Sequence, residues 1–251
     1  MRRKRANMTS TTKCEFCGAE LAARYIDNPL KTHAKHAPLK RIMIGYELCD
    51  CEGAQRARIE SMEREEARKA AERAQLIDAK LRKAGIPERY LFAQHEMAAS
   101  MAESVATAGK GYYIDGPQGT GKTHLAYSVA RLCVMQGIKT TCVSSTSLME
   151  AYRFRNKDDS DLTRRLMACG LLVIDDLGKE SPTQYACERL FDVIDTRYNS
   201  MRPIIVTSNY ARGSIAGKLT EGDVGKSIAS RLNEMTQRIH IDGEDRRLNR
   251  G

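Results

Sequence analysis

The residues best suited to chemistry begin in a glycine-rich segment near the middle of the 251-residue chain. Residues 116–123 match the spacing of a phosphate-binding loop, with an apolar strand predicted before them and a helix after them. Glycine lets backbone N–H groups curl around a phosphate, and the helix N-terminus adds partial positive charge. The segment therefore predicts binding of ATP or GTP. The predicted nucleotide-binding residues are Gly116, Pro117, Gln118, Gly119, Thr120, Gly121, Lys122, Thr123 and His124.

Catalytic roles are predicted at the end of this loop and after an apolar strand. Lys122 would reach the β- and γ-phosphates, and the Thr123 hydroxyl would bind Mg²⁺. Residues 171–174 are apolar and lead into two acids, so a buried strand would deliver Asp175 to the magnesium ion. Asp176 would face the γ-phosphate and orient an attacking water.

A second apolar strand, residues 204–208, leads into Asn209. We predict a catalytic role for Asn209, which would hydrogen-bond the γ-phosphate or the attacking water. Asn also forms simple turns after strands, and two adjacent acids can likewise mark a strand-end turn. The phosphate-binding loop in the same chain favours the catalytic interpretation in both places.

Four cysteines near the start of the chain have the spacing of a metal site. Cys14 and Cys17 are separated by two residues, and Cys49 and Cys51 by one, so each pair can direct two sulfurs at one ion. Zn²⁺ prefers four thiolate or imidazole ligands in a tetrahedron, and four protein ligands leave no position for a substrate. The prediction is a structural zinc site. Two histidines between the pairs are open alternatives to one cysteine: His33 and His36.

Alternating strands and helices are predicted from about residue 86 onward, which indicates a mostly parallel sheet covered by helices on both faces. The expected strands are Gly111–Asp115, Lys139–Val143, Leu171–Asp175, Ile204–Ser208 and Arg238–Ile241. The expected helices are 122–136, 146–155, 183–199 and 226–235. Four further cysteines lie among apolar residues and are predicted to be buried: Cys133, Cys142, Cys169 and Cys187.

A long helix is predicted at residues 52–84, where Ala, Glu, Arg and Lys dominate and apolar positions form only a narrow stripe. Gly85 and Pro87 would end this helix. The predicted parts are a basic disordered tail (1–12), a zinc-binding module (13–51), a helical linker (52–84) and an ATPase domain (85–251).

Composition and charge exclude several classes of protein. Hydrophobic residues make up 41% of the chain, yet the longest apolar runs are far short of the ~20 residues that span a bilayer. No apolar stretch follows the basic first residues, so neither export nor a membrane is expected, and a cytoplasmic location is predicted. The net charge is +9, and residues 1–84 hold 19 Lys and Arg against 12 Asp and Glu. This excess indicates nucleic acid or an acidic protein surface as partner, or a solvated tail.

Residues 85–251 resemble the AAA+ ATPases, and within them the bacterial helicase loaders of the DnaC and DnaI type and the related transposition ATPase IstB. The resemblance is carried by the phosphate-binding loop and by residues 85–90, 175–178, 190–198, 205–209 and 228–232. It implies an α/β fold, the P-loop AAA+ three-layer sandwich with a mostly parallel sheet. A small zinc-binding domain and a long helix would precede this sandwich.

The resemblance also implies roles for three arginines. Arg231 is similar to the arginine finger that reaches the ATP of a neighbouring subunit and contributes ~10³–10⁵ in rate, so isolated subunits should hydrolyse slowly. The alternative for Arg231 is a solvated helix residue. Residues 243–247 resemble the closing segment of the family, in which Arg247 is a candidate nucleotide sensor. For Arg197 two roles stay open: a contact at a subunit interface, or an ion pair on the surface.

An ATP-dependent helicase loader is the function that the resemblance implies. The zinc module and helix would bind a replicative DnaB-type helicase, and the ATPase domains would form a homo-oligomer on it and deliver it to single-stranded DNA during replication. ATP, Mg²⁺ and structural Zn²⁺ are the implied cofactors. The first alternative is an IstB-like ATPase that binds duplex DNA and assists a transposase, although zinc-bearing N-terminal domains are typical of DnaI-like loaders. A small-molecule kinase is the third interpretation.

Overall fold

The computed structural model describes residues 11–27, 41–153, 158–180, 182–220 and 222–245. Contacts between residues divide the chain into two compact units, Met1–Ala74 and Gln75–Gly251, and each is considered by itself. Most of the predicted basic tail, residues 1–10, lies outside the described residues. Thr11 and Thr12, which end that tail, belong to a strand.

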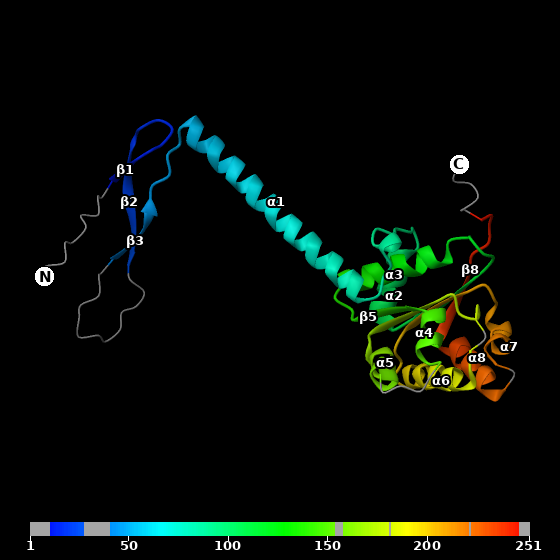
Figure 1. Ribbon diagram of the computed structural model, residues 1–251. Helices are drawn as coiled ribbons and strands as arrows, with labels where there is room; N and C mark the ends of the chain where they lie inside the picture. Colours follow the sequence, from blue (N-terminus) through cyan, green and yellow to red (C-terminus); the bar gives the residue numbers. More distant parts are fainter. Residues whose placement is uncertain (1–10, 28–40, 154–157, 181, 221, 246–251) are drawn as a thin grey trace, which may run out of the picture. The chain divides into compact units, whose positions relative to one another are not determined.

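A three-stranded antiparallel sheet forms the first unit's folded part, in the order β1-β2-β3 (Figure 1). Its strands are β1 (Thr11–Lys13), β2 (Glu20–Asp27) and β3 (Arg41–Tyr46). Four of its larger apolar side chains are exposed: Tyr25, Ile26, Ile42 and Ile44. Among the described residues 11–27 and 41–51, Cys14 is the one that is buried. Within that part of the chain, apolar packing therefore cannot account for the fold.

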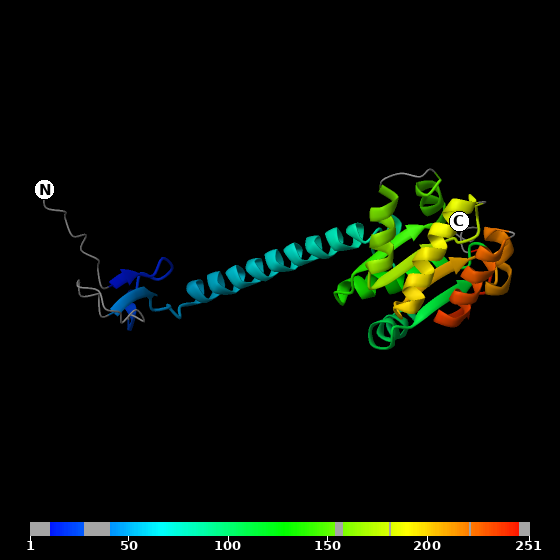
Figure 2. The same ribbon diagram turned by 90° about the horizontal axis from the view of Figure 1, so that it is seen from below.

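The helix α1 (Glu52–Lys83) confirms the long helix predicted from the sequence, and Figure 2 shows it uninterrupted. Ion pairs between residues four apart line its surface, with N–O distances of 2.7 to 4.0 Å, and each stabilises the helix only slightly. Leu81 is its single buried residue. After the helix, Gly85 has a φ of +86°, and a Cβ there would lie 2.3 Å from the carbonyl oxygen of Cys142, so this position requires glycine.

The second unit is built on a five-stranded parallel sheet in the order β5-β6-β7-β4-β8. The strands are β4 (Gly111–Asp115), β5 (Thr140–Ser144), β6 (Leu171–Asp175), β7 (Ile204–Ser208) and β8 (Thr236–His240). All five expected strands are present, with bounds that differ by at most two residues from the predicted ones. Every residue of β4, β6 and β7 is buried, as in central strands covered on both faces.

Helices cover both faces of this sheet and create two separate hydrophobic clusters (Figure 2). Neighbouring strand residues point to opposite clusters, as Tyr112 and Tyr113 do on β4. One cluster includes α2 (Ala98–Ala108) and α3 (Lys122–Met135). The other includes α4 (Ser145–Ala151), α5 (Asp158–Ala168), α6 (Gln184–Asn199), α7 (Ala216–Leu219) and α8 (Asp223–Met235). This arrangement confirms the predicted three-layer sandwich.

Several smaller features complete the second unit. Two short 3₁₀ helices occur, η1 (Glu88–Tyr90) and η2 (Arg212–Ser214). The predicted core cysteines are buried, as expected: Cys133, Cys142, Cys169 and Cys187. None of the helices that the structure describes has the length and apolar character needed to cross a membrane.

Candidate nucleotide site and candidate zinc centre

The phosphate-binding loop joins β4 to α3 and has a backbone that suits glycine. Gly116, Gly119 and Gly121 have φ angles of +144°, +80° and +102°. A Cβ at Gly116 would lie 1.9 Å from the carbonyl oxygen of Ile241, which is too close for any side chain. Both the left-handed backbone and the approach of the segment after β8 therefore require glycine in this loop.

Lys122 is buried at the start of α3, directly behind the loop. Its Nζ donates hydrogen bonds to the carbonyl oxygens of Gly116 at 2.9 Å and Pro117 at 2.6 Å. The helix begins after Gly121, which has no side chain to cap it. The first backbone N–H groups of α3 are therefore suited to bind an anion such as a phosphate.

Thr123 and Asp175 meet at the carboxyl end of β6, although they are 52 residues apart in the chain. Thr123 Oγ1 donates to Asp175 Oδ1 at 2.9 Å, and Thr207 Oγ1 donates to the same oxygen at 2.6 Å. Burial raises the pKa of Asp175 despite both hydrogen bonds, because the charged carboxylate is poorly solvated there. A hydroxyl beside a buried carboxylate fits Mg²⁺. Thr123 and Asp175 would hold this ion, whose charge stabilises phosphate oxygens when it is bound.

A cavity of about 490 Å³ lies against the loop, large enough for a nucleotide. Asp176 lines this cavity, and its left-handed backbone (φ +59°) is fixed because its N–H donates to Thr207 Oγ1 at 2.8 Å. Asn209, just after β7, lines the same cavity. The structure thus brings the predicted loop, Asp176 and Asn209 together. The lining residues are Arg89, Tyr90, Gln118, Gly119, Gly121, Lys122, Thr123, His124, Asp176, Lys179 and Asn209.

Three of these lining residues are not predicted as site residues from the sequence: Arg89, Tyr90 and Lys179. The Tyr90 ring stacks on Tyr127 of α3 with centroids 4.9 Å apart, and the Arg89 guanidinium lies 5.9 Å from the Tyr90 centroid. Arg89 and Tyr90 fall within residues 85–90, which carry part of the family resemblance, so the sequence did contain a signal that could have identified them as site residues. Nothing in the sequence identifies Lys179 as a site residue, because a lysine after a turn is usually a solvated surface side chain.

Arg231 does not line this cavity. On α8 its Nε donates to Asp195 Oδ1 at 2.9 Å, and its guanidinium lies 4.6 Å from the centroid of the Tyr198 ring. The hydrogen bond with Asp195 raises the pKa of Arg231, which keeps its positive charge. Action on the ATP of a neighbouring subunit stays a prediction. Arg247, the predicted nucleotide sensor, lies outside the described residues.

Arg197 differs from both alternatives considered for it, a subunit interface and a surface ion pair. It is fully buried on α6, and its guanidinium donates to the carbonyl oxygens of Leu166 at 2.7 Å, Cys169 at 2.9 Å and Pro203 at 2.6 Å. These carbonyls belong to the end of α5 and to the loops before β6 and β7. Arg197 therefore joins the end of α5 to the segment before β7 within the core, and both interpretations were wrong.

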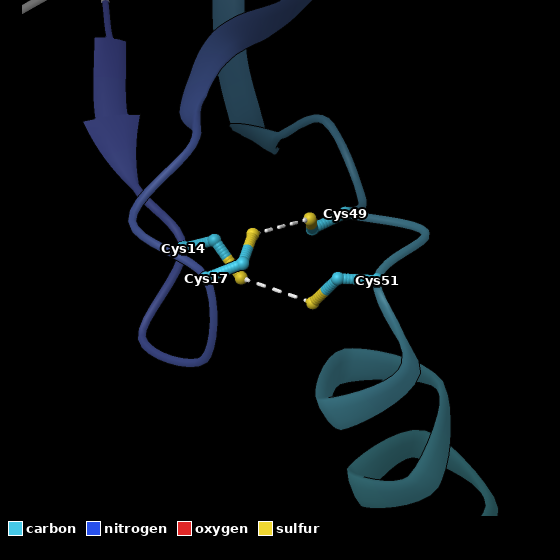
Figure 3. Close-up of side chains that lie close together, drawn as sticks. All are labelled: Cys14, Cys17, Cys49 and Cys51. Atoms are coloured by element: carbon cyan, nitrogen blue, oxygen red, sulfur yellow. Dashed lines mark hydrogen bonds between the residues drawn. The ribbon is translucent and has the colours of Figure 1, made fainter.

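The four cysteine sulfurs of the first unit converge, as Figure 3 shows. All four Sγ atoms lie within 4.8 Å of one another, with 3.8 Å between Cys14 and Cys51 and 3.4 Å between Cys17 and Cys49. A tetrahedron of ~2.3 Å Zn–S bonds places sulfurs ~3.8 Å apart, so the cluster fits Zn²⁺. Hydrogen bonds from the backbone N–H of Phe16 and Cys17 lower the pKa of Cys14 to about 7, which favours the thiolate.

The cysteine cluster fits a structural metal site, because four protein ligands leave no coordination position for a substrate. All eight cysteines of the chain are free of disulfides. The backbone N–H of Ala54, in the first turn of α1, donates to Cys51 Sγ at 3.4 Å, so the cluster also anchors the start of α1. The two open alternatives for a zinc ligand, His33 and His36, lie outside the described residues.

The parallel sheet, the phosphate-binding loop and the acids at the end of β6 together define a P-loop ATP-binding protein of the AAA+ class. A family model matches residues 56–251, and the chain belongs to this family, the IstB-like ATP binding proteins. Membership supports ATP binding and, in general, ATPase activity. The predicted resemblance to AAA+ ATPases is confirmed.

The relatives of this chain include proteins of DNA replication and proteins of insertion sequences. An ATP-binding protein of insertion sequence IS5376 from Geobacillus stearothermophilus is 30% identical over 136 residues, 53% of each chain. The replicative helicase loader DnaC of Escherichia coli is 29% identical over 102 residues, 39% of this chain and 42% of DnaC. The chain thus spans about half the length of these curated relatives. The crystal structure of DnaI matches with a TM-score of 0.54 and 24% identity over 62% of this chain and 94% of DnaI, which shows the shared fold.

Proposed function

We propose that this chain is an ATPase that loads a replicative DnaB-type helicase onto single-stranded DNA. Its relatives support an ATP-driven role connected with DNA, and they include both helicase loaders and insertion-sequence proteins. The observation that favours the loader is the cluster of four cysteines that precedes the second unit, residues 75–251, which we call the ATPase unit. A separate N-terminal module that is held together by a metal ion is typical of DnaI-like loaders. Here this module would bind the helicase.

Hydrolysis at the proposed site would follow from the residues around the cavity. Backbone N–H groups of the loop and Lys122 would bind the phosphates, and Asp176 would orient a water toward the γ-phosphorus. The water oxygen bonds to phosphorus as the bond to the β–γ bridging oxygen breaks, which releases ADP and phosphate. Asn209 would hold the γ-phosphate or the water in place.

Neighbouring copies would complete this site. Arg231 lies on α8 with its charge kept by Asp195 and does not line its own cavity, which is compatible with action on a neighbour. ATP would then stabilise a homo-oligomer on the helicase, and hydrolysis would release it. Energy from ATP would change affinity between partners rather than create a covalent product. Slow hydrolysis by the isolated chain follows from this arrangement.

Capture of purified partners by the immobilised full-length chain tests the loader. With a non-hydrolysable ATP analogue present, we expect retention of the replicative helicase of the same organism and of single-stranded DNA. A Cys49→Ser, Cys51→Ser double variant should lose the helicase but still bind nucleotide. Retention of the helicase by this double variant, with its zinc lost, would contradict the role given to the zinc module.

An IstB-like role in transposition is the second candidate, and two observations favour it. The family model that matches is that of the IstB-like proteins, and the IS5376 protein is 30% identical. Under this alternative the chain would bind duplex DNA and a transposase in the ATP state. Retention of a transposase and duplex DNA in the same capture experiment, with no retention of the helicase, would replace the loader by this role.

A further inference from the structure

The turn after β6 places one more charged side chain at the nucleotide cavity. Asp176 and Gly178 both have left-handed backbones, with φ of +59° and +91°. Between them, Leu177 is buried, its N–H donates to the carbonyl oxygen of Thr207 at 2.8 Å, and its own carbonyl accepts from Ser208 Oγ at 2.6 Å. The turn is therefore fixed to the end of β7.

The chain is also fixed on the other side of this turn. The Glu180 carboxylate accepts hydrogen bonds from the hydroxyls of Ser145 and Thr146, the latter at 3.2 Å, where α4 begins. A Cβ at Gly178 would lie 2.6 Å from Cδ1 of Ile215, so this residue is packed without free space. Lys179 therefore stands between two anchored residues and has little freedom to move its backbone.

Lys179 is exposed and lines the cavity beside Asp176, Asn209 and Lys122. The nearest acid along the chain, Glu180, is already engaged by two hydroxyls. No residue in the described part of the chain forms an ion pair or hydrogen bond with the Lys179 ammonium. A cation in this position offsets the repulsion that two adjacent carboxylates, Asp175 and Asp176, exert on a triphosphate.

We infer that Lys179 binds the terminal phosphate of a nucleoside triphosphate and gives the site its preference for triphosphate over diphosphate. Lys122 approaches the phosphates from the loop, whereas Lys179, Asp176 and Asn209 approach from the ends of β6 and β7. An ADP molecule held by the loop lacks the group that Lys179 contacts. The inference rests on the nucleotide binding in the proposed function and adds a residue that distinguishes its two nucleotide states.

Binding of a non-hydrolysable ATP analogue and of ADP to the full-length chain, measured by calorimetry with Mg²⁺, tests this inference. Loss of one charge-assisted contact should weaken binding of the ATP analogue to Lys179→Met roughly tenfold and leave ADP binding within about twofold. Lys179→Arg, which keeps the charge, should retain most of the preference. Lys110→Met is the matched control, because Lys110 is exposed just before β4 and does not line the cavity. It should leave both affinities unchanged.

Three outcomes would overturn the inference. Equal ATP and ADP effects in Lys179→Met would show a general role in folding or charge, and no effect on either would show that Lys179 does not touch the nucleotide. Lys179→Gln provides a second neutral variant, so an unchanged ratio in both variants is decisive. If the wild-type chain binds neither nucleotide, the proposed ATPase function fails as well, which separates that failure from the failure of Lys179 alone.

Discussion

The cysteine module (residues 13–51) and the ATPase unit (residues 75–251) reach a folded state by different means. Among the described residues 11–27 and 41–51, a single side chain is buried, and four sulfurs converge within 4.8 Å. In the ATPase unit, every residue of β4, β6 and β7 is buried and helices cover both faces of the sheet. Metal binding should therefore decide the folding of the cysteine module, whereas burial of apolar side chains should decide that of the ATPase unit.

Removal of zinc should produce the largest effect, because the free energy of structural zinc binding, ~10–16 kcal/mol, is folding free energy in such modules. Cys49→Ser together with Cys51→Ser should abolish the zinc content of one ion per chain and unfold the cysteine module. The ATPase unit should keep its thermal unfolding. Metal analysis and hydrogen exchange of the full chain measure both. Cys187→Ala, which removes a buried thiol of the ATPase unit, is the control and should leave zinc bound. Wild-type protein that holds no zinc after purification without chelator would contradict the role of the metal in folding.

Arg231→Ala should spare nucleotide binding and lower ATP turnover of the assembled protein by ~10³-fold, since an arginine finger contributes ~10³–10⁵ in rate. Steady-state turnover with partner helicase and single-stranded DNA measures the effect. Arg164→Ala removes an exposed arginine paired with Asp161 on α5 and should change nothing. Undiminished turnover of Arg231→Ala in the DNA-bound assembly would assign this arginine to the helix surface.

Lys122→Ala should affect the ATPase unit and leave the cysteine module unchanged. We expect nucleotide affinity to fall at least ~100-fold, since a buried ammonium that would bind two phosphates is lost. Zinc content and hydrogen exchange of residues 13–51 should stay as in wild type. Calorimetric titration with ATP measures the loss, and a variant that still binds ATP tightly would contradict the role of the loop.

Arg238→Leu should destabilise the ATPase unit at pH 7, by less than the changes above, because it removes a charged partner of the buried Asp115 carboxylate. Asp115, at the end of β4, accepts hydrogen bonds from Arg238 at 2.6 and 3.1 Å and interacts with His240 at 2.5 Å. Burial alone would raise the pKa of Asp115, but these partners outweigh it and lower the pKa below its ordinary value of 3.8. The stabilisation is therefore complete above that value and is lost as pH falls through the lower folded pKa.

Urea unfolding at pH 7 and in strong acid tests this dependence on pH. The difference in free energy of unfolding between wild type and Arg238→Leu should shrink in acid. Lys226→Leu, which removes an exposed partner of Asp223, is the control and should show little change at either pH. An equal effect of Arg238→Leu on the free energy of unfolding at both pH values would contradict a stabilising ion pair between Arg238 and Asp115.

The strands of the ATPase unit and most residues at its cavity could be predicted because each is marked by a short, continuous stretch of sequence. Each motif can be recognised by itself: the loop with its glycines and Lys122, and the two acids after residues 171–174. Parallel strands then bring both motifs to the same edge of the sheet. The zinc ligands were predictable for the same reason, since spacing alone lets cysteine pairs share an ion.

The rest depended on contacts between distant segments. Apolar side chains of β2 and β3, such as Tyr25 and Ile44, are exposed. Apolar and polar residues therefore do not alternate clearly enough in the sequence to predict these strands. Arg197 donates to carbonyls of two segments, residues 166–169 and Pro203, and nothing in its neighbouring sequence indicates these partners. Lys179 faces the cavity only because hydrogen bonds to β7 and α4 fix the turn around it.

ATP turnover per chain across a dilution series tests our proposal that nucleotide bound between neighbouring copies controls which partners stay attached. If the proposal is right, turnover per chain falls as the protein is diluted and recovers when helicase and single-stranded DNA are added. Full turnover by the dilute chain alone, or no response to ATP under any condition, would contradict it.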